Sequence, residues 1–211
     1  MKTITPTPTP TTFFLPADDL RAALHCVSAT SYYLNGVFVE SDNLVATDGH
    51  QMLTIELPDG CHVGTECFTQ GMDAPEGAGF ILSCDATNKA FKAKAAVSRD
   101  LWVYGDIETG ILQFVINHKE GGEMSRVGVL EFTRIDGTYP EWRRVVAKGD
   151  GGDASLCYDP AVLARLVKAA DVIEKGKGVR LTGGEGDPIR VDFVASPRLR
   201  GTLIPIRWTG A

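Results

Sequence analysis

One pattern of secondary-structure signals recurs three times along the 211-residue chain, and this repeat limits the possible folds more than any other feature. Each copy begins with a short apolar strand, continues with an amphipathic helix and ends with three strands. The copies cover residues 13–58, 80–146 and 154–208. Because short alternating strands joined by turns form antiparallel sheets, the pattern predicts an α+β protein built of repeated βαβββ units.

The elements of each copy are indicated by helix start signals and by apolar alternation. Pro16 opens the first helix, Asp85 is a suitable N-cap for a second helix through residue 95, and Asp159 with Pro160 starts the third. Short strands at residues 13–15, 80–82 and 156–158 precede these helices. The later strands are predicted at residues 33–40, 44–46, 52–57, 101–104, 111–117, 127–135, 178–181, 189–194 and 202–207.

Three segments have no strand or helix period and divide the chain. The Thr-Pro repeats within residues 1–12 predict an extended, disordered tail. Residues 59–79, rich in glycine, proline and charge, are interpreted as a connector between the first two copies. The glycine-rich residues 149–153 mark a boundary before the third copy.

Composition is that of an ordinary soluble globular protein, with 44% hydrophobic and 23% charged residues. No apolar run reaches the length of a membrane span and no apolar signal region is present, so a cytoplasmic location is expected. The net charge of −6 argues against a simple DNA-coating protein but allows positive charge gathered on one face. The five cysteines have neither CxxC nor zinc-ligand spacing, so no disulfide framework, metal or cofactor is predicted.

The stretch Val45-Ala46-Thr47-Asp48-Gly49-His50-Gln51-Met52 lies between two apolar runs, and its Asp-Gly pair predicts a β-hairpin turn. Asp48 and His50 could be a general-base pair or metal ligands of a hydrolytic enzyme. However, no serine or cysteine lies in a recognisable nucleophile motif. An aspartate that bonds its own turn backbone is the simpler interpretation, so no catalytic residue is predicted.

Three stretches together resemble one family. Tyr33-Leu34-Asn35-Gly36 with residues 45–50, the run Asp-Gly-Thr-Tyr-Pro-Glu-Trp-Arg-Arg-Val-Val at 136–146, and Leu-Ile-Pro-Ile-Arg-Trp at 203–208 are similar to the bacterial sliding clamp, the β subunit of DNA polymerase III. Their order along the chain is also the family's order.

This resemblance implies a DNA clamp-like fold whose helices lie on one side of antiparallel sheets. Residues 13–148 would form a complete clamp-like domain of two half-units, similar to the family's central domain. Residues 154–211 would be a third half-unit, similar to the C-terminal half of the last domain. The implied function is that of a processivity or recruitment factor for DNA replication, without catalytic activity of its own.

In the family, an apolar pocket binds short peptides of the replicative DNA polymerase and other clamp-binding proteins. Its position implies pocket residues Leu34, Thr47, Gly49, His50, Met52, Pro140, Arg144, Val145, Ile204, Pro205, Ile206 and Arg207. Apolar side chains would form the floor, while His50 and the arginines would orient the peptide. Three positions depart from the family's pattern: Gln51 replaces a usual arginine, Val162 a common tyrosine, and Trp208 a terminal leucine.

Clamp helices face duplex DNA, which implies sequence-independent phosphate contacts by Lys89, Lys92, Lys94, Arg165 and Lys168. Without the resemblance, a solvated helix face is the simpler interpretation of these cations. Two alternatives to a clamp remain: a clamp mimic that binds clamp partners without encircling DNA, and the hydrolytic enzyme described above.

The count of half-units also bears on assembly. A third half-unit without a mate exposes a sheet edge and an apolar helix face, so pairing of two chains about a twofold axis is expected. Two such dimers could close a ring.

Overall fold

The computed structural model describes residues 12–64, 79–83, 101–117, 124–146, 158–175, 178–183 and 187–206. The predicted tail up to residue 11, the predicted helix 85–95 and residues 156 and 157 of a predicted strand lie outside this part of the chain. Within it, no helix is long and apolar enough to cross a membrane.

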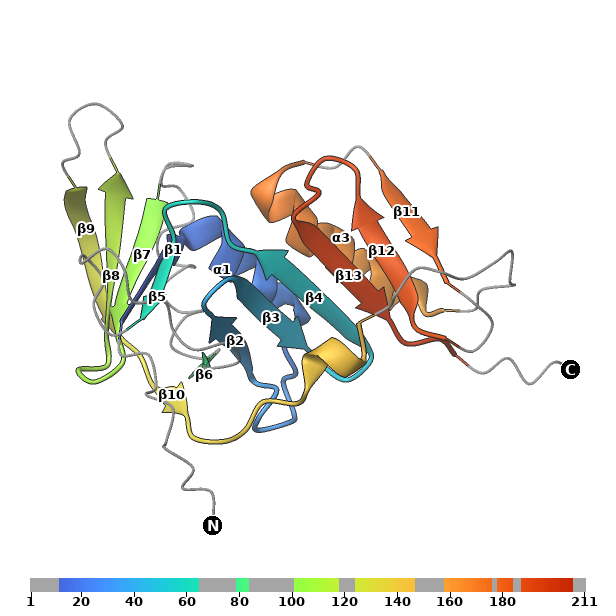
Figure 1. The fold of residues 1–211 in the computed structure, drawn as a ribbon, viewed down its shortest axis with the longest axis horizontal. Helices are drawn as coiled ribbons and strands as arrows, with labels where there is room; N and C mark the ends of the chain where they lie inside the picture. The colour runs from blue at the N-terminus through green and yellow to red at the C-terminus, as the bar shows by residue number, and fades with distance from the viewer. Residues whose placement is uncertain are drawn as a thin grey trace, which may run out of the picture.

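The described elements of the first unit follow the predicted strand–helix–strand order, whereas the helix of the second unit and most of the first strand of the third lie outside the described residues (Figure 1). The first unit contains β1 (Thr12–Pro16), α1 (Ala17–Ala23), the 3-10 turn η1 (Leu24–Cys26), β2 (Gly36–Glu40), β3 (Asn43–Thr47) and β4 (Gln51–Glu56). After β5 (His62–Gly64), the second contains β6 (Gly79–Ser83), β7 (Leu101–Asp106), β8 (Ile111–Asn117), β9 (Met124–Glu131), β10 (Arg134–Ile135) and the 3-10 turn η2 (Trp142–Arg144). The third contains α3 (Pro160–Ile173), β11 (Val179–Thr182), β12 (Ile189–Phe193) and β13 (Leu199–Leu203).

All described strands belong to two antiparallel sheets, as predicted. The five-stranded sheet has the order β5-β1-β7-β8-β9, and the eight-stranded sheet has the order β10-β6-β2-β3-β4-β13-β12-β11. The first two units exchange their first strands, because β1 pairs with β7 and β6 pairs with β2. Leu15 lies opposite Val103, and Leu82 opposite Val37. Neither unit therefore has a complete sheet without the other.

The third unit is joined directly to the first. β13 pairs with β4, with Gly201 opposite Leu53, so the two sheets continue as one. Helices α1 and α3 contact each other on the same side of this sheet (Figure 1). The expectation that the third unit has no partner within the chain was therefore wrong for its β13 edge, because β4 supplies the missing strand.

The main core lies between the sheets and the helices. Phe13, Leu20, Leu53 and Leu166 are fully buried there. A smaller apolar cluster of Val45, Met52, Ile81, Ile135 and Tyr139 lies on the other face of the eight-stranded sheet. Successive strand residues point to opposite faces, which is why Leu44 belongs to the main core and Val45 to the smaller cluster.

Several strand boundaries differ from the prediction. The closing strand predicted at residues 202–207 lies at Leu199–Leu203, because its register is set by long-range pairing with β4. Pro205 follows the strand and has no N–H to donate to a ladder. The strand predicted from residue 33 begins at Gly36, where a Cβ atom would lie 2.5 Å from the Leu82 carbonyl oxygen. Tyr158, the described end of the strand predicted at 156–158, is not in a strand.

A buried ion pair fastens the third unit to the first. Both guanidinium NH groups of Arg198 donate to the Asp19 carboxylate of α1 at 2.6 Å, and the Asp19 side chain is 1% exposed. Burial raises the pKa of the Asp19 carboxyl, and the hydrogen bond and charge of Arg198 oppose that effect. Arg198 also donates to the Glu56 carbonyl oxygen at 3.2 Å, and its own carbonyl accepts from the Glu56 N–H at 2.9 Å. One residue thus connects α1, β4 and the turn before β13.

We expect Arg198→Ala to lower the free energy of unfolding by about 3 kcal/mol, because it leaves a buried carboxylate without its partner. The matched control is Arg190→Ala, which breaks a half-exposed pair with Asp192 at 2.7 Å and should cost less than about 1 kcal/mol. Urea denaturation of both variants measures the difference. Equal losses would show that the Arg198 pair does not fasten the junction.

Candidate functional site

The hairpin turn between β3 and β4 is built by Asp48, as the sequence predicted. Its Oδ1 atom accepts hydrogen bonds from the backbone N–H of His50 at 2.9 Å and of Gln51 at 3.0 Å. Gly49 has a φ of 90°, in the left-handed region that favours glycine. The backbone N–H of Gly49 donates to the Thr47 hydroxyl at 3.1 Å. These contacts fix the direction in which the turn presents His50.

The second carboxylate oxygen of Asp48 binds the third unit. Arg165 of α3 donates to Asp48 Oδ2 at 2.6 Å, where the Asp48 side chain is 8% exposed and that of Arg165 is 41% exposed. Arg165, which the resemblance assigned to DNA contact, therefore holds α3 against the turn. Asp48 uses its carboxylate for the turn and for this ion pair, which agrees with a structural rather than a catalytic role.

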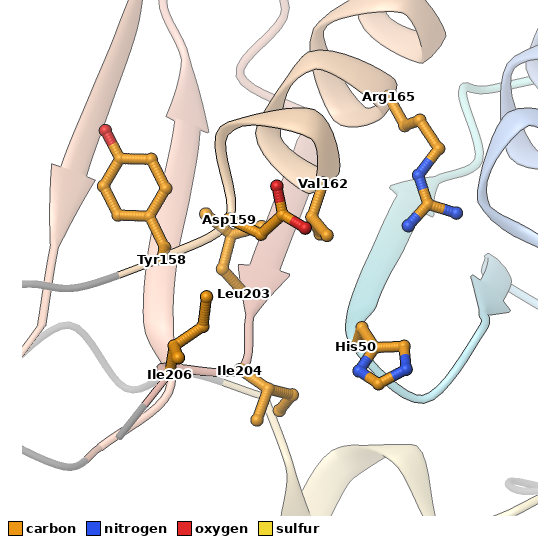
Figure 2. Close-up of a pocket in the computed structure, with 8 residues that line it drawn as sticks. All are labelled: His50, Tyr158, Asp159, Val162, Arg165, Leu203, Ile204 and Ile206. Carbon is orange, nitrogen blue, oxygen red and sulfur yellow. The ribbon is translucent and has the colours of Figure 1, made fainter. Parts of the chain in front are cut away.

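A cavity of about 210 Å³ opens where the turn, α3 and the end of β13 meet. Figure 2 shows the His50 ring and the Arg165 guanidinium on one side of it, with Leu203, Ile204 and Ile206 across from them. The full lining is His50, Tyr158, Asp159, Val162, Arg165, Leu203, Ile204 and Ile206. The cavity thus combines an apolar wall with a polar edge, a combination suited to an amphipathic ligand.

Three predicted pocket residues line this cavity: His50, Ile204 and Ile206. The two isoleucines follow β13 and are 42% and 50% exposed, which is high for large apolar side chains. The Ile204 N–H donates to the His50 carbonyl oxygen at 3.0 Å, so the two chain segments are held side by side. Pro205, between the isoleucines, is half-buried.

Four other predicted pocket residues do not line the cavity: Leu34, Thr47, Gly49 and Met52. Met52 is 3% exposed in the smaller apolar cluster, and Leu34 packs against the same cluster. Thr47 and Gly49 form the turn. Gln51, at the position where the family usually has arginine, is 1% exposed, and its side-chain amide has no hydrogen-bond partner among the described residues.

The remaining predicted pocket residues do not line the cavity. Pro140, Arg144 and Val145 lie on the segment around η2 and are exposed. Arg144 pairs with Glu141 at 2.7 Å, with both side chains largely in solvent. Arg207 lies outside the described residues. The structure therefore places these positions at the surface near the smaller cluster rather than among the residues that line the cavity.

Five lining residues were not among the predicted pocket residues, although Val162 was noted as standing where the family commonly has a tyrosine: Tyr158, Asp159, Val162, Arg165 and Leu203. Asp159 was recognised only as a helix cap, and it does accept a hydrogen bond from the Ala161 N–H at 2.8 Å. Val162 and Arg165 are three residues apart and therefore share a helix face. That spacing was visible in the sequence, but the pairing of β13 with β4 that brings α3 to the turn was not.

A second cavity, of about 360 Å³, lies between β2 and the segment of residues 137–143. Glu40, which is 2% exposed, anchors this segment. Its carboxylate accepts two hydrogen bonds from Arg143, at 3.0 and 2.8 Å, and one from the Trp142 indole at 3.3 Å. The Arg143 guanidinium lies 4.3 Å from the centre of the Trp142 ring. This fixed arrangement holds the segment that leads to Pro140 and Arg144.

The helix side of the junction carries a small group of basic residues. His25 follows α1 on η1, and burial, with Lys168 and Arg21 nearby, lowers the pKa of its imidazole. Lys168 of α3 is exposed, whereas Arg21 pairs with Asp18 at 2.8 Å. Lys89, Lys92 and Lys94 lie outside the described part of the chain. Among the described residues, no three His, Cys, Asp or Glu side chains are grouped to hold a metal ion.

Comparison with known proteins identifies the fold. Neither a scan against family models nor a search of curated proteins finds a match to the sequence. Among solved structures, a putative DNA polymerase III β subunit from Eubacterium rectale matches with a TM-score of 0.63 and 12% identity, over 100% of this chain and 69% of that one. The β subunit from Thermotoga maritima matches with a TM-score of 0.62 and 13% identity, over 99% and 69%. A sliding clamp from Bartonella birtlesii bound to griselimycin matches with a TM-score of 0.57 and 17% identity, over 98% and 69%.

The chain therefore has the fold of a DNA sliding clamp. Within that class, its fold is that of the bacterial DNA polymerase III β subunit, and it spans about 69% of the length of the clamps it matches. This confirms the fold that the three sequence stretches implied.

Two substitutions of Asp48 should separate its two roles. Asp48→Asn keeps an oxygen for the turn N–H groups but loses the charge opposite Arg165, and we expect it to lower the free energy of unfolding by about 1 kcal/mol. Asp48→Ala removes both functions and should lower the free energy of unfolding by about 1–2 kcal/mol more. Thermal and urea unfolding measure both values. Identical losses for the two variants would contradict a structural role of the turn hydrogen bonds.

Proposed function

We propose that this protein is a sliding-clamp-like factor of DNA replication that recruits partner proteins and has no catalytic activity. Its site would bind a short peptide of a replicative polymerase or another clamp-binding protein in the cavity between the β3–β4 turn and α3. The observation that carries the proposal is the pair of exposed isoleucines, Ile204 and Ile206, beside a cavity on the clamp fold. Exposed large apolar residues around a hollow are typical of binding sites.

The shape and chemistry of the cavity favour a peptide. Leu203 is buried and forms part of the wall, while the two isoleucines remain open to a ligand. An apolar side chain of a peptide would displace water from this wall, and the polar edge at His50, Asp159 and Arg165 would orient its polar groups. A cavity of about 210 Å³ suits one or two side chains rather than a whole domain.

We further propose that the helix side of the protein contacts duplex DNA without reading its sequence. Lys168 and His25 lie close to each other on this side, and the remaining predicted contacts, Lys89, Lys92 and Lys94, belong to the second unit. Arg165 contributes less than predicted, since Asp48 already neutralises it. The cations would bind phosphates through charge alone.

A clamp mimic, which binds clamp partners without encircling DNA, is the second candidate. The net charge of −6 and the ion pair of Arg165 favour it, because both reduce the attraction of DNA. Peptide binding is common to both candidates, and duplex binding separates them.

The peptide site is tested by Ile204→Ser combined with Ile206→Ser. A labelled peptide with a clamp-binding motif should bind the native protein, and the double variant should lose about 2 kcal/mol of binding free energy, or about thirtyfold in affinity. Val194→Ser is the matched control, because Val194 is 64% exposed after β12 and does not line the cavity. Calorimetric titration gives the affinities. An unchanged affinity in the double variant would reject the site.

The DNA surface is tested by Lys168→Glu, with Lys175→Glu beyond the end of α3 as the control for net charge. Lys168→Glu should weaken duplex binding several-fold for every DNA sequence. It should also flatten the salt dependence of the affinity, because about one phosphate contact is lost.

The same surface predicts a pH dependence. Burial lowers the pKa of the His25 imidazole in the free protein, and a bound phosphate would favour its protonated form. Duplex affinity should therefore rise as the pH falls below about 6.5. Fluorescence anisotropy at several salt concentrations gives these values. A native protein without duplex affinity at low salt, even when placed on circular DNA, would favour the mimic.

A further inference from the structure

Three arginines lie on the face of the third unit that is turned away from the helices. Arg180 is on β11, Arg190 on β12 and Arg200 on β13, and these strands neighbour one another in the sheet (Figure 1). Apolar residues next to each arginine pack in or against the main core on the helix side, as Val191 and Leu199 do. Because successive strand residues point to opposite faces, the three arginines share the other face.

The sheet register places one carboxylate among these arginines. Asp192 lies directly opposite Arg180 on one side and Arg200 on the other. Its ion pair is with Arg190 on its own strand, whose Nε atom lies 2.7 Å from Oδ1. Glu56, at the end of β4, lies diagonally across from Arg200. Arg180 and Arg200 are exposed, and neither takes part in an ion pair with another described residue. The arginines therefore outnumber the carboxylates around them.

Protection of the sheet edge does not account for this cluster. A charged side chain on an end strand hinders edge-to-edge pairing, and Arg180 on β11 serves that purpose. However, β12 and β13 are interior strands, where Arg190 and Arg200 protect no edge. Like charges on neighbouring strands destabilise a sheet, and the chain as a whole carries a net charge of −6. A bound anion would remove this repulsion, so the cluster has the properties of an anion-binding surface.

We propose that this face binds an acidic segment of a partner protein, with its carboxylates on the three arginines. A guanidinium presents paired N–H groups that match a carboxylate, and Arg190 already binds the carboxylate of Asp192. Diagonal neighbours on adjacent strands are about 7–8 Å apart, which is the relation of Arg190 to both Arg180 and Arg200. Alternate side chains of an extended peptide are about 7 Å apart, so acidic residues at alternate positions fit this spacing. The proposal does not rest on the cavity or on Lys168.

A nucleic acid fits this face less well than an acidic peptide. Single strands bind proteins largely by stacking their bases on aromatic side chains. Besides the arginines and Asp192, the residues of β11, β12 and β13 on this face are Thr182 and Thr202, so these strands offer no aromatic ring to a base. A long polyanion would also extend past the arginines over a chain of net charge −6, whereas a short acidic segment covers the arginines alone.

The surface is tested with a short labelled peptide of alternating glutamate and serine. The peptide should bind the full chain at low salt, and its affinity should fall as the salt concentration rises. Arg180→Gln combined with Arg200→Gln should weaken binding about tenfold or more, because two charge-assisted contacts are lost. The matched control is Arg134→Gln combined with Lys175→Gln, which changes the net charge equally at exposed residues elsewhere. Fluorescence anisotropy gives the affinities. Equal losses in the two double variants, or no binding at low salt, would overturn the proposal.

A substitution that strengthens binding cannot be mistaken for a failure to fold. Asp192→Asn removes the carboxylate that competes for Arg190, so the acidic peptide should bind several-fold more tightly. The control is Glu108→Gln, which makes the same charge change at an exposed turn of the other sheet. An Asp192→Asn protein that binds no more tightly than Glu108→Gln would contradict the proposal.

An oligothymidylate of the same charge as the peptide separates the two kinds of anion. The acidic peptide should bind more tightly than this single strand. If the oligothymidylate binds more tightly, and loses that binding when Arg180 and Arg200 are replaced by glutamine, the face binds nucleic acid and the proposed partner is wrong.

Discussion

The pairing of β13 with β4 is the contact on which the rest of the structure depends. Backbone N–H and C=O groups at a strand edge need hydrogen-bond partners. Here β13, the last strand of the third unit, supplies them to β4, the edge strand of the first unit. This pairing makes one sheet of eight strands and brings α3 beside α1. Two ion pairs act at the same junction: Asp19 with Arg198, and Asp48 with Arg165. The first is more deeply buried and so contributes more to holding the units together.

The candidate site is a direct product of this junction. Neither unit contains the cavity alone, because the first supplies His50 while the third supplies Val162, Leu203 and Ile206. The hydrogen bond from the Ile204 N–H to the His50 carbonyl oxygen continues the β13–β4 pairing beyond the last ladder residue. The chain then leaves the sheet at Pro205, which exposes the isoleucines instead of burying them in another strand. A site of this kind exists only while the junction is intact.

The sequence predicted the local features of this fold well, because each has a local cause. The Asp48–Gly49 hairpin and the Asp159 cap with Pro160 depend on residues a few positions apart, and both predictions were confirmed. The exchange of β1 and β6, the register of β13 and the Asp48–Arg165 pair connect residues far apart in sequence, and periodicity carries no information about them. For the same reason, His50, Ile204 and Ile206 were placed in the pocket only through family resemblance. Arg165 was assigned to DNA contact by the same resemblance, and its ion pair with Asp48, far away in the sequence, could not be predicted.

The proposed peptide site and the proposed DNA surface meet along one helix. Val162 and Arg165 line the cavity, and Lys168, three residues farther along α3, lies near His25. The ion pair of Arg165 with Asp48 holds this part of α3 against the turn between β3 and β4. The position of the cavity wall and the position of Lys168 therefore depend on the same contact. A change that breaks this ion pair would affect both proposed surfaces at once.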